Sequence, residues 1–246
     1  GSDLKVGDHL PVSDIFPVSD EITHWDITEC LSKNEYLFMS EVSKALDCVS
    51  EGRFWWTKNN NKRFKLPYSR SDIFYASFLS KSNSSRRHNI QYNENCVYPR
   101  RSSFQPAHVP EKIPFDKEFG FFIGAYLAEG CCTKHHVLIA NCDFDFNTRI
   151  SNFCKQWGLK FHVDEGPRPK GYSKTLRIHS LVLAQLLLKT IKTGSHNKEF
   201  PSIFLQAPED FQKGLIDGYF SGDGTISKKQ TSILATSTSK QLLQGI

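Results

Sequence analysis

Two short apolar stretches decide the fold of this chain. Residues 122–130 read FIGAYLAEG and residues 216–224 read IDGYFSGDG, so each stretch ends in an acid followed by glycine. Both are apolar on nearly every side, as in a buried helix. Each also has small residues at i, i+4 spacing, which lets two helix backbones approach closely. We therefore expect two helices that pack together and end in Glu129 and Asp223.

The two terminal acids need a partner of opposite charge. A carboxylate in the last turn of a helix faces the negative end of the helix dipole. Two such carboxylates brought together also repel each other, and a shared divalent metal ion removes that repulsion. The pattern therefore favours a metal site between the helix ends. Two buried helices that merely end in acidic residues are the alternative interpretation.

The paired stretches resemble the motifs of LAGLIDADG homing endonucleases in their two-copy, single-chain form. The resemblance implies an α+β fold, in which αββαββα units form a saddle and the motif helices lie between the units. It also implies that Glu129 and Asp223 are catalytic and bind Mg²⁺, for which Mn²⁺ can substitute. Backbone carbonyls at Ala128 and Gly222 would complete the metal ligands. The first acid is glutamate where the family more often has aspartate, which favours a decayed site as the alternative.

The segment before the second stretch supplies a third catalytic candidate. Residues 197–201 read NKEFP and resemble the family segment that precedes its second motif. The resemblance implies that Lys198 is a catalytic residue that eases charge build-up on phosphate. Pro208, with Glu209 and Asp210 behind it, predicts the start of the second motif helix.

The second unit is expected to be incomplete. After the second motif we expect a strand over residues 232–236 and a helix over 240–243, which Ser239 caps. The later strands and last helix of a complete unit would follow residue 246. We therefore expect a fragment with a truncated second copy, whose remainder is a partner, either on a separate chain or in a longer protein.

The first unit can be predicted element by element from residue 114 onward. Asp116 is a candidate N-cap of the first motif helix. We expect a strand over 136–141, a helix over 147–157, strands over 160–164 and 175–179, and a helix over 181–191. Leu176, Ile178, Phe161 and Val163 alternate with polar residues, so they are expected to face the core.

The other face of this expected sheet is basic. A polar, basic sheet face with a basic hairpin tip suits the major groove of DNA. An ordinary amphipathic sheet in water is the alternative. The candidates for DNA contact on the sheet and its hairpin are Lys160, His162, Arg168, Lys170, Arg177 and His179.

A second basic region precedes the expected core. Residues 53–112 contain twelve Lys and Arg against three Asp and Glu, a net charge of +9, whereas the rest of the chain carries −4. Such a block is typical of a nucleic-acid footprint, although a solvated basic face would look the same. The candidates here are Arg53, Lys62, Arg63, Lys65, Arg86, Arg87, Arg100 and Arg101.

Composition and motifs divide the chain into three parts. Residues 1–20 are expected to form a β-rich stub, in which residues 4–12 read LKVGDHLPV and resemble a segment of inteins just before their inserted endonuclease. A generic strand and turn is the alternative for this short match. Residues 21–113 are expected to be a basic accessory DNA-recognition module, helical over about 22–50, that ends in an extended linker. Residues 114–246 would be the LAGLIDADG endonuclease core.

These features lead to one main functional hypothesis. The chain would be a site-specific double-strand DNA endonuclease of the intein-homing type, with a long, asymmetric duplex target and metal-dependent phosphodiester hydrolysis. Protein splicing would be the activity of the whole intein, and this chain could be inactive by itself. A non-cleaving DNA-binding protein on a decayed LAGLIDADG scaffold is the alternative. An RNA maturase is a third possibility, against which the intein-like stub argues.

Composition also bears on the cellular compartment. No apolar run is long enough to span a bilayer, so no membrane partner is expected. The seven cysteines contain no CxxC pair, which indicates a reducing compartment inside the cell, either cytoplasm or nucleus. Cys131 and Cys132 are expected to be buried packing residues.

Overall fold

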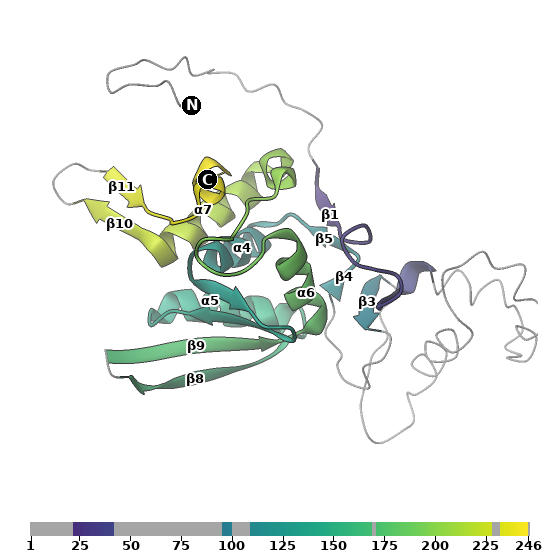
Figure 1. Ribbon diagram of the computed structural model, residues 1–246, viewed down its shortest axis with the longest axis horizontal. Helices are drawn as coiled ribbons and strands as arrows, with labels where there is room; N and C mark the ends of the chain where they lie inside the picture. Colours follow the sequence, from purple (N-terminus) through teal and green to yellow (C-terminus); the bar gives the residue numbers. More distant parts are fainter. Residues whose placement is uncertain (1–21, 42–94, 100–108, 169–170, 228–231, 246) are drawn as a thin grey trace, which may run out of the picture.

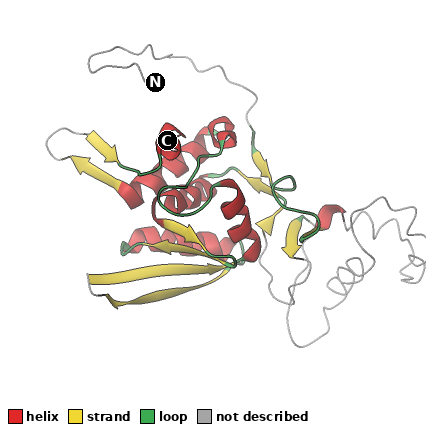
Figure 2. Cartoon of the chain, in the orientation of Figure 1, coloured by secondary structure: helices red, strands yellow, loops and turns green. Residues whose placement is uncertain are grey.

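The computed structural model describes residues 22–41, 95–99, 109–168, 171–227 and 232–245. These residues form an α+β structure in which helices and antiparallel sheets share one hydrophobic core (Figures 1 and 2). Within these ranges, none of the helices combines the length and the apolar character that crossing a membrane requires.

Two long helices lie side by side at the centre of the molecule (Figure 1). They are α4 (Lys117–Glu129) and α7 (Glu209–Asp223), the two helices expected from the sequence. Asp116 caps α4 as predicted, because its Oδ1 accepts a hydrogen bond of 2.7 Å from the Phe119 amide. At the start of α7, Pro208 is the N-cap residue and two acids occupy the first turn, where the helix dipole favours them.

The two helices approach closely because glycine lies at each point of contact. A Cβ atom on Gly124 would collide with the carbonyl oxygen of Leu215, and one on Gly218 would collide with that of Phe121. The same holds for Gly120 against Phe211 and for Gly214 against Lys117. The expected backbone-to-backbone packing is therefore confirmed, and Gly120 extends it by one turn that the sequence did not reveal.

The elements after α4 form the first unit. They are β6 (Gly130–Cys132), β7 (His136–Ala140), α5 (Phe144–Gln156), β8 (Lys160–Arg168), β9 (Gly171–His179) and α6 (Leu181–Thr190). The strands form one antiparallel sheet in the order β6-β7-β9-β8. This order of helices and strands agrees with the expected αββαββα unit. Helix α5 begins three residues earlier than predicted, because Asp143 caps it with a 2.8 Å bond from the Phe146 amide.

One face of this sheet carries the apolar residues and faces the core. Leu176 and Ile178 are fully buried, as predicted, and Phe161 packs partly buried against the same core. Val163 pairs with Leu176 and so lies on the predicted face, but it is 37% exposed. Its strand β8 lies at the edge of the sheet and has a neighbouring strand on one side only, which leaves the other side to solvent.

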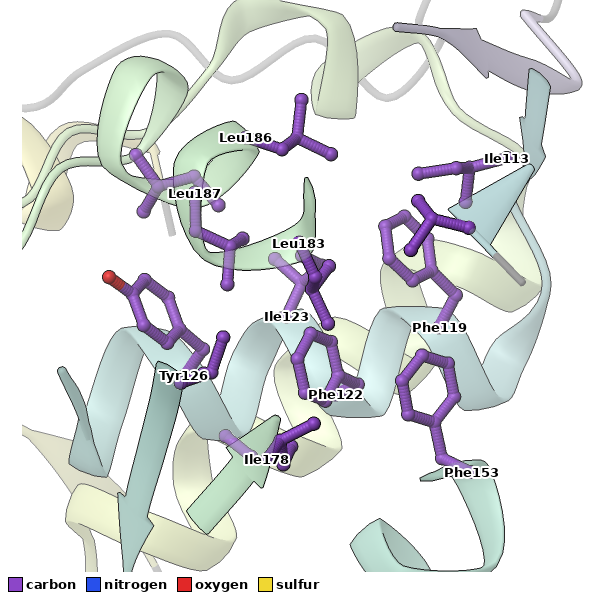
Figure 3. Close-up of a cluster of buried hydrophobic side chains, with 14 of the residues drawn as sticks. Ile113, Phe119, Phe122, Ile123, Tyr126, Phe153, Ile178, Leu183, Leu186 and Leu187 are labelled. Carbon is purple, nitrogen blue, oxygen red and sulfur yellow. The ribbon is translucent and has the colours of Figure 1, made fainter. Parts of the chain in front are cut away.

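Aromatic and aliphatic side chains of α4 form the centre of the core, shown in Figure 3. Phe122 stacks on Phe153 of α5 with ring centroids 4.5 Å apart. Burial of each such side chain stabilises the fold by about 1.5–3 kcal/mol. Tyr126 is also buried, and its hydroxyl donates a 2.6 Å hydrogen bond to the carbonyl of Lys192. The other residues labelled in Figure 3 are Ile113, Phe119, Ile123, Ile178, Leu183, Leu186 and Leu187.

The described residues before α4 form short strands. Strand β1 (His24–Asp26) pairs with β5 (Lys112–Pro114), and β2 (Tyr36–Phe38), β3 (Cys96–Pro99) and β4 (Val109–Pro110) form a second sheet. The expected helix over 22–50 is wrong where β1 and β2 occur, and the expected linker contains β3 and β4. Both errors have one cause, since pairing between distant segments overrides the local pattern. Residues 1–20 and most of the basic block lie outside the described residues.

The second unit follows α6. It contains a 3₁₀ turn, η1 (Ser202–Gln206), followed by α7, β10 (Gly224–Ser227), β11 (Ser232–Ala235) and α8 (Lys240–Gly245). Strands β10 and β11 pair as an antiparallel hairpin. The expected strand and capped helix are confirmed, because Ser239 Oγ accepts a 3.2 Å bond from the Leu242 amide. The saddle that the resemblance implies stays a prediction.

Candidate functional site

The ends of the two central helices meet in one pocket. Glu129 is the last residue of α4 and Asp223 is the last residue of α7. A Cβ atom on Gly222 would lie 2.5 Å from Ala128 Cβ and 3.1 Å from Glu129 Cγ, so the two last turns are in contact. Both acids and Ala128 line a pocket of about 460 Å³. The structure thus brings together the residues that the sequence proposed as catalytic and metal-binding.

Burial destabilises the ionised forms of the two acids in this pocket. Burial raises the pKa of Glu129, and the nearby charge of Asp223 raises it further. Burial also raises the pKa of Asp223. Lys198 opposes both shifts without cancelling them. An additional positive charge in the pocket would therefore stabilise the ionised pair.

The donor set fits Mg²⁺ better than a metal held wholly by side chains. Across the residues that the structure describes, no three His, Cys, Asp or Glu side chains converge closely enough to hold a metal ion. Mg²⁺ is usually bound by one or two carboxylates together with water and substrate phosphates. Glu129 and Asp223 supply such a pair, and the volume of the pocket leaves room for the remaining ligands.

Lys198 lies beside the acids but contacts the helix end. Its side chain is only 4% exposed, and its ammonium group donates hydrogen bonds to three carbonyls in the last turn of α4. The acceptors are Tyr126, Leu127 and Ala128, at 2.8, 2.7 and 3.4 Å from Nζ. Burial lowers the pKa of Lys198 to about 8, although Asp223 and Glu129 oppose the shift. Lys198 is thus a cation at the negative end of the α4 dipole.

Sequence reasoning missed the rest of the pocket. Cys131 is exposed and lines it, so the expectation that Cys131 is buried is wrong. Strand β6 begins at Gly130, and the register pairs Cys131 with Leu138, on the sheet face away from the core. Alternation along a strand directly after the helix could have revealed this. The remaining polar lining of Ser195 and residues 236–238 follows no motif.

The polar sheet face assembles four of the predicted DNA contacts. The register places Lys160 beside His179 and His162 beside Arg177, all on the face opposite Leu176 and Ile178. His162 Nδ1 lies 2.7 Å from His179 Nε2.

Asp164, which the sequence reading did not include, belongs to the same face. Arg177 donates to its Oδ2 through Nε at 3.1 Å and through a terminal nitrogen at 2.8 Å. These hydrogen bonds hold the pKa of Asp164 below its usual range. Part of the positive charge of the face is therefore neutralised within the protein.

The other predicted DNA contacts cannot be placed within the described residues. The side chain of Arg168, at the end of β8, is not described, and Lys170 follows in the adjoining hairpin. Arg53, Lys62, Arg63, Lys65, Arg86, Arg87, Arg100 and Arg101 also lie outside the described residues.

Parts of proteins with differing names are similar to this chain. It is 38% identical over 138 residues to the DNA-directed RNA polymerase subunit Rpo1C of Methanocaldococcus jannaschii, which covers 56% of this chain and 16% of that protein. It is 25% identical over 167 residues to a probable translation initiation factor IF-2 of the same organism, covering 65% of this chain and 14% of that protein. It is 20% identical over 246 residues to the DNA polymerase II large subunit of Thermococcus kodakarensis, covering 99% of this chain and 13% of that protein. The chain thus spans less than a fifth of the length of each of these relatives.

A family match covers the second motif. Residues 210–246 include most of α7, the β10–β11 hairpin and α8. They contain Asp223 and the glycines that contact α4. These residues match the LAGLIDADG-like domain, which supports the LAGLIDADG family for this chain.

Proposed function

We propose that this chain is a site-specific double-strand DNA endonuclease of the two-motif LAGLIDADG type. One observation carries the proposal. Two glycine-packed helices end in Glu129 and Asp223, and both acids open into one pocket beside Lys198. The family match covers only the second motif, and the equivalent packing and terminal acid of α4 support α4 as the first.

The relatives support an intein origin. Their names describe an RNA polymerase subunit, an initiation factor and a DNA polymerase subunit, and the chain matches less than a fifth of each. A mobile segment inserted into unrelated host proteins would produce this pattern. The intein-like residues 4–12 agree with it, and splicing would then be an activity of the complete intein.

The proposed chemistry is hydrolysis of a phosphodiester in each DNA strand. Glu129 and Asp223 would hold Mg²⁺, or Mn²⁺ in its place, and backbone carbonyls at Ala128 and Gly222 are further candidate ligands. When bound, the metal would lower the pKa of attacking water and neutralise charge on the leaving oxygen. Lys198 would offset negative charge in the pocket and hold the end of α4.

The proposed partner is duplex DNA with a long, asymmetric target. The polar face of the first sheet would lie against one half of the site. The β10–β11 hairpin would begin the corresponding surface of the second half, which the remainder of the second unit would complete. A DNA substrate also agrees with the proposed location inside the cell.

A non-cleaving DNA-binding protein is the second candidate. The contacts of Lys198 favour it, because all three hydrogen bonds of its ammonium group go to α4 carbonyls, including the Ala128 carbonyl expected to bind metal. Glutamate at position 129, where the family more often has aspartate, also favours the non-cleaving candidate.

Metal-dependent nicking separates the two candidates. Duplexes that bind the chain would be selected from a random DNA library and then incubated with Mg²⁺, with Mn²⁺ or with EDTA. The measurement would use the chain alone and the chain extended to complete its second unit. We expect nicking in Mg²⁺ that stops in EDTA. Asp223→Asn should abolish nicking and keep DNA binding, while Asp145→Asn, outside the pocket, should keep both. Binding without nicking in either metal would instead establish the non-cleaving candidate.

A further inference from the structure

The main chain of Lys198 is fixed by Ser239, the residue directly before α8. Ser239 Oγ donates a 2.6 Å hydrogen bond to the Lys198 carbonyl and accepts one of 3.2 Å from the Leu242 amide. Ser239 is only 3% exposed, so water cannot easily replace either bond. One hydroxyl group therefore caps α8 and also anchors the backbone of Lys198.

Two further contacts hold α8 against the connector, residues 195–200, which contains Lys198. Thr238 Oγ1 donates a 2.9 Å bond to the carbonyl of Ser195, three residues before Lys198. At the other end of α8, Gly245 lies so close to Phe200 that an added Cβ would collide with the Phe200 ring. The connector is thus fixed to α8 on both sides of Lys198.

The side chain of Lys198 transmits this anchoring to α4. Lys198 is only 4% exposed, so its four-carbon stem is packed and the reach of its ammonium group depends on where its backbone is held. The ammonium group binds the last-turn carbonyls at residues 126–128, immediately before Glu129. A continuous chain of buried contacts therefore runs from Ser239 through Lys198 to the end of α4.

We infer that Ser239 is a positioning residue for Glu129 and acts through Lys198. An element of the second unit, α8, thereby fixes the acid of the first unit. Ser239 does not itself reach the pocket acids, and its effect is to keep the last turn of α4 closed around the Lys198 ammonium group. The functional part of this inference, that Glu129 binds metal, rests on the proposed function.

Amide exchange at the two helix ends tests the positioning directly, without metal or DNA. The Gly130 amide donates to the Tyr126 carbonyl at the end of α4, and the Gly224 amide donates to the Phe220 carbonyl at the end of α7. In Ser239→Ala, we expect the Gly130 amide to exchange at least about tenfold faster, because local opening sets the exchange rate. The Gly224 amide should keep its wild-type rate.

Two variants separate positioning from loss of a helix cap. Ser180 is also a buried N-cap serine, whose Oγ accepts a 3.2 Å bond from the Leu183 amide, and it caps α6. Ser180→Ala should lower the melting temperature and leave the exchange of Gly130 unchanged. Ser239→Thr retains the hydroxyl oxygen and should restore slow exchange at Gly130. Wild-type exchange at Gly130 in Ser239→Ala, or equal acceleration in Ser180→Ala, would overturn the inference.

A Mn²⁺ titration of the same proteins distinguishes this inference from the proposed function. If the wild type binds Mn²⁺ at the pocket, Ser239→Ala should weaken its affinity several-fold and Ser180→Ala should not. Unchanged Mn²⁺ affinity in Ser239→Ala would contradict a role in positioning the metal-binding acid. If the wild type binds no Mn²⁺ while Gly130 exchange still accelerates in Ser239→Ala, the positioning stands and the proposed metal site fails.

Discussion

Residues without a side chain decide how closely the central helices pack. At Gly124 and Gly218, any Cβ would displace a backbone carbonyl of the facing helix, which cannot move aside as a flexible side chain can. The i, i+4 spacing of small residues revealed these two positions from the sequence. Gly120 was missed, because it lies before the motif that drew attention to the helix.

Replacement of Gly218 by alanine should therefore separate α4 from α7. We expect Gly218→Ala to lower the free energy of unfolding by about 1–3 kcal/mol through overpacking. Gly166→Ala is the matched control, because a Cβ there would meet no atom within 4 Å. Urea denaturation of both variants measures the difference. Equal, small effects would show that the helices can part without loss of stability.

The role of Lys198 could be predicted only in part. A resemblance in a short connector identified the residue, and the structure places it beside both acids. Its hydrogen bonds to the α4 carbonyls could not be predicted, since the two segments are 70 or more positions apart in the sequence. Ser239 was predicted as a helix cap, but nothing in the sequence showed that its hydroxyl also holds Lys198.

Helices and strands with strong periodicity were predicted well. The alternation in β8 and β9 and the apolar pattern of α6 arise from burial on one face, which local sequence records. Strands β1 and β2 were predicted as helix, because their pairing partners lie far along the chain. Each strand has only three residues, too few to carry a period that distinguishes a strand from a helix.

Arg149 connects three helices and should stabilise their arrangement. From α5 it donates to Glu118 of α4 at 3.0 Å and to Asp217 of α7, and its guanidinium group lies 3.8 Å from the centroid of the Phe121 ring. We expect Arg149→Met to lower the free energy of unfolding by about 1 kcal/mol, a value already discounted for solvent screening.

The matched control for Arg149 is a salt bridge within one helix. Lys213 pairs with Glu209 on the exposed surface of α7 at 2.8 Å, and it connects no second element. Lys213→Met should therefore change the free energy of unfolding much less than Arg149→Met in the same denaturation assay. Equal effects would mean that Arg149 contributes no more than a surface ion pair.

The histidines of the sheet face should make DNA binding depend on pH. The ring of His179 lies against those of His136 and His162, and Arg177 and Asp164 face the same cluster. Burial lowers the pKa of His136 and of His179, so these rings gain their charge only below the usual range of histidine. As pH falls below that range, added positive charge should strengthen binding to phosphate.

Fluorescence anisotropy with duplex DNA between about pH 7.5 and about pH 5.5 measures this effect. The double variant His136→Gln/His179→Gln should lose most of the increase in affinity at low pH, and His24→Gln, on β1, should keep it. Because the folded-state pKa values are depressed, the unfolded state binds more protons at low pH. The free energy of unfolding should therefore decrease as pH falls over the same range. The folded fraction must therefore be checked at each pH. Full pH dependence in the double variant would exclude these histidines as the cause.

At the scale of the whole molecule, α4 of the first unit packs against α7 of the second unit, and the acids at the ends of both helices line one pocket. The α4–α7 packing brings together two residues that are far apart in the chain and places both in one pocket with Lys198. The sequence was sufficient for this pairing, because each motif records both the close contact and the terminal acid. It was insufficient for the polar lining of the pocket, which comes from loops without a pattern.

The most direct test of a shared metal site is a Mn²⁺ titration followed by amide signals in NMR spectra. Gly130 and Gly224 directly follow the two acids, so a paramagnetic ion between Glu129 and Asp223 should broaden both signals together. We predict that both signals broaden at the same Mn²⁺ concentration, that EDTA restores them, and that Asp223→Asn abolishes the effect at both positions. Broadening at only one of the two glycines, or at neither, would contradict a metal ion shared by the two helix ends.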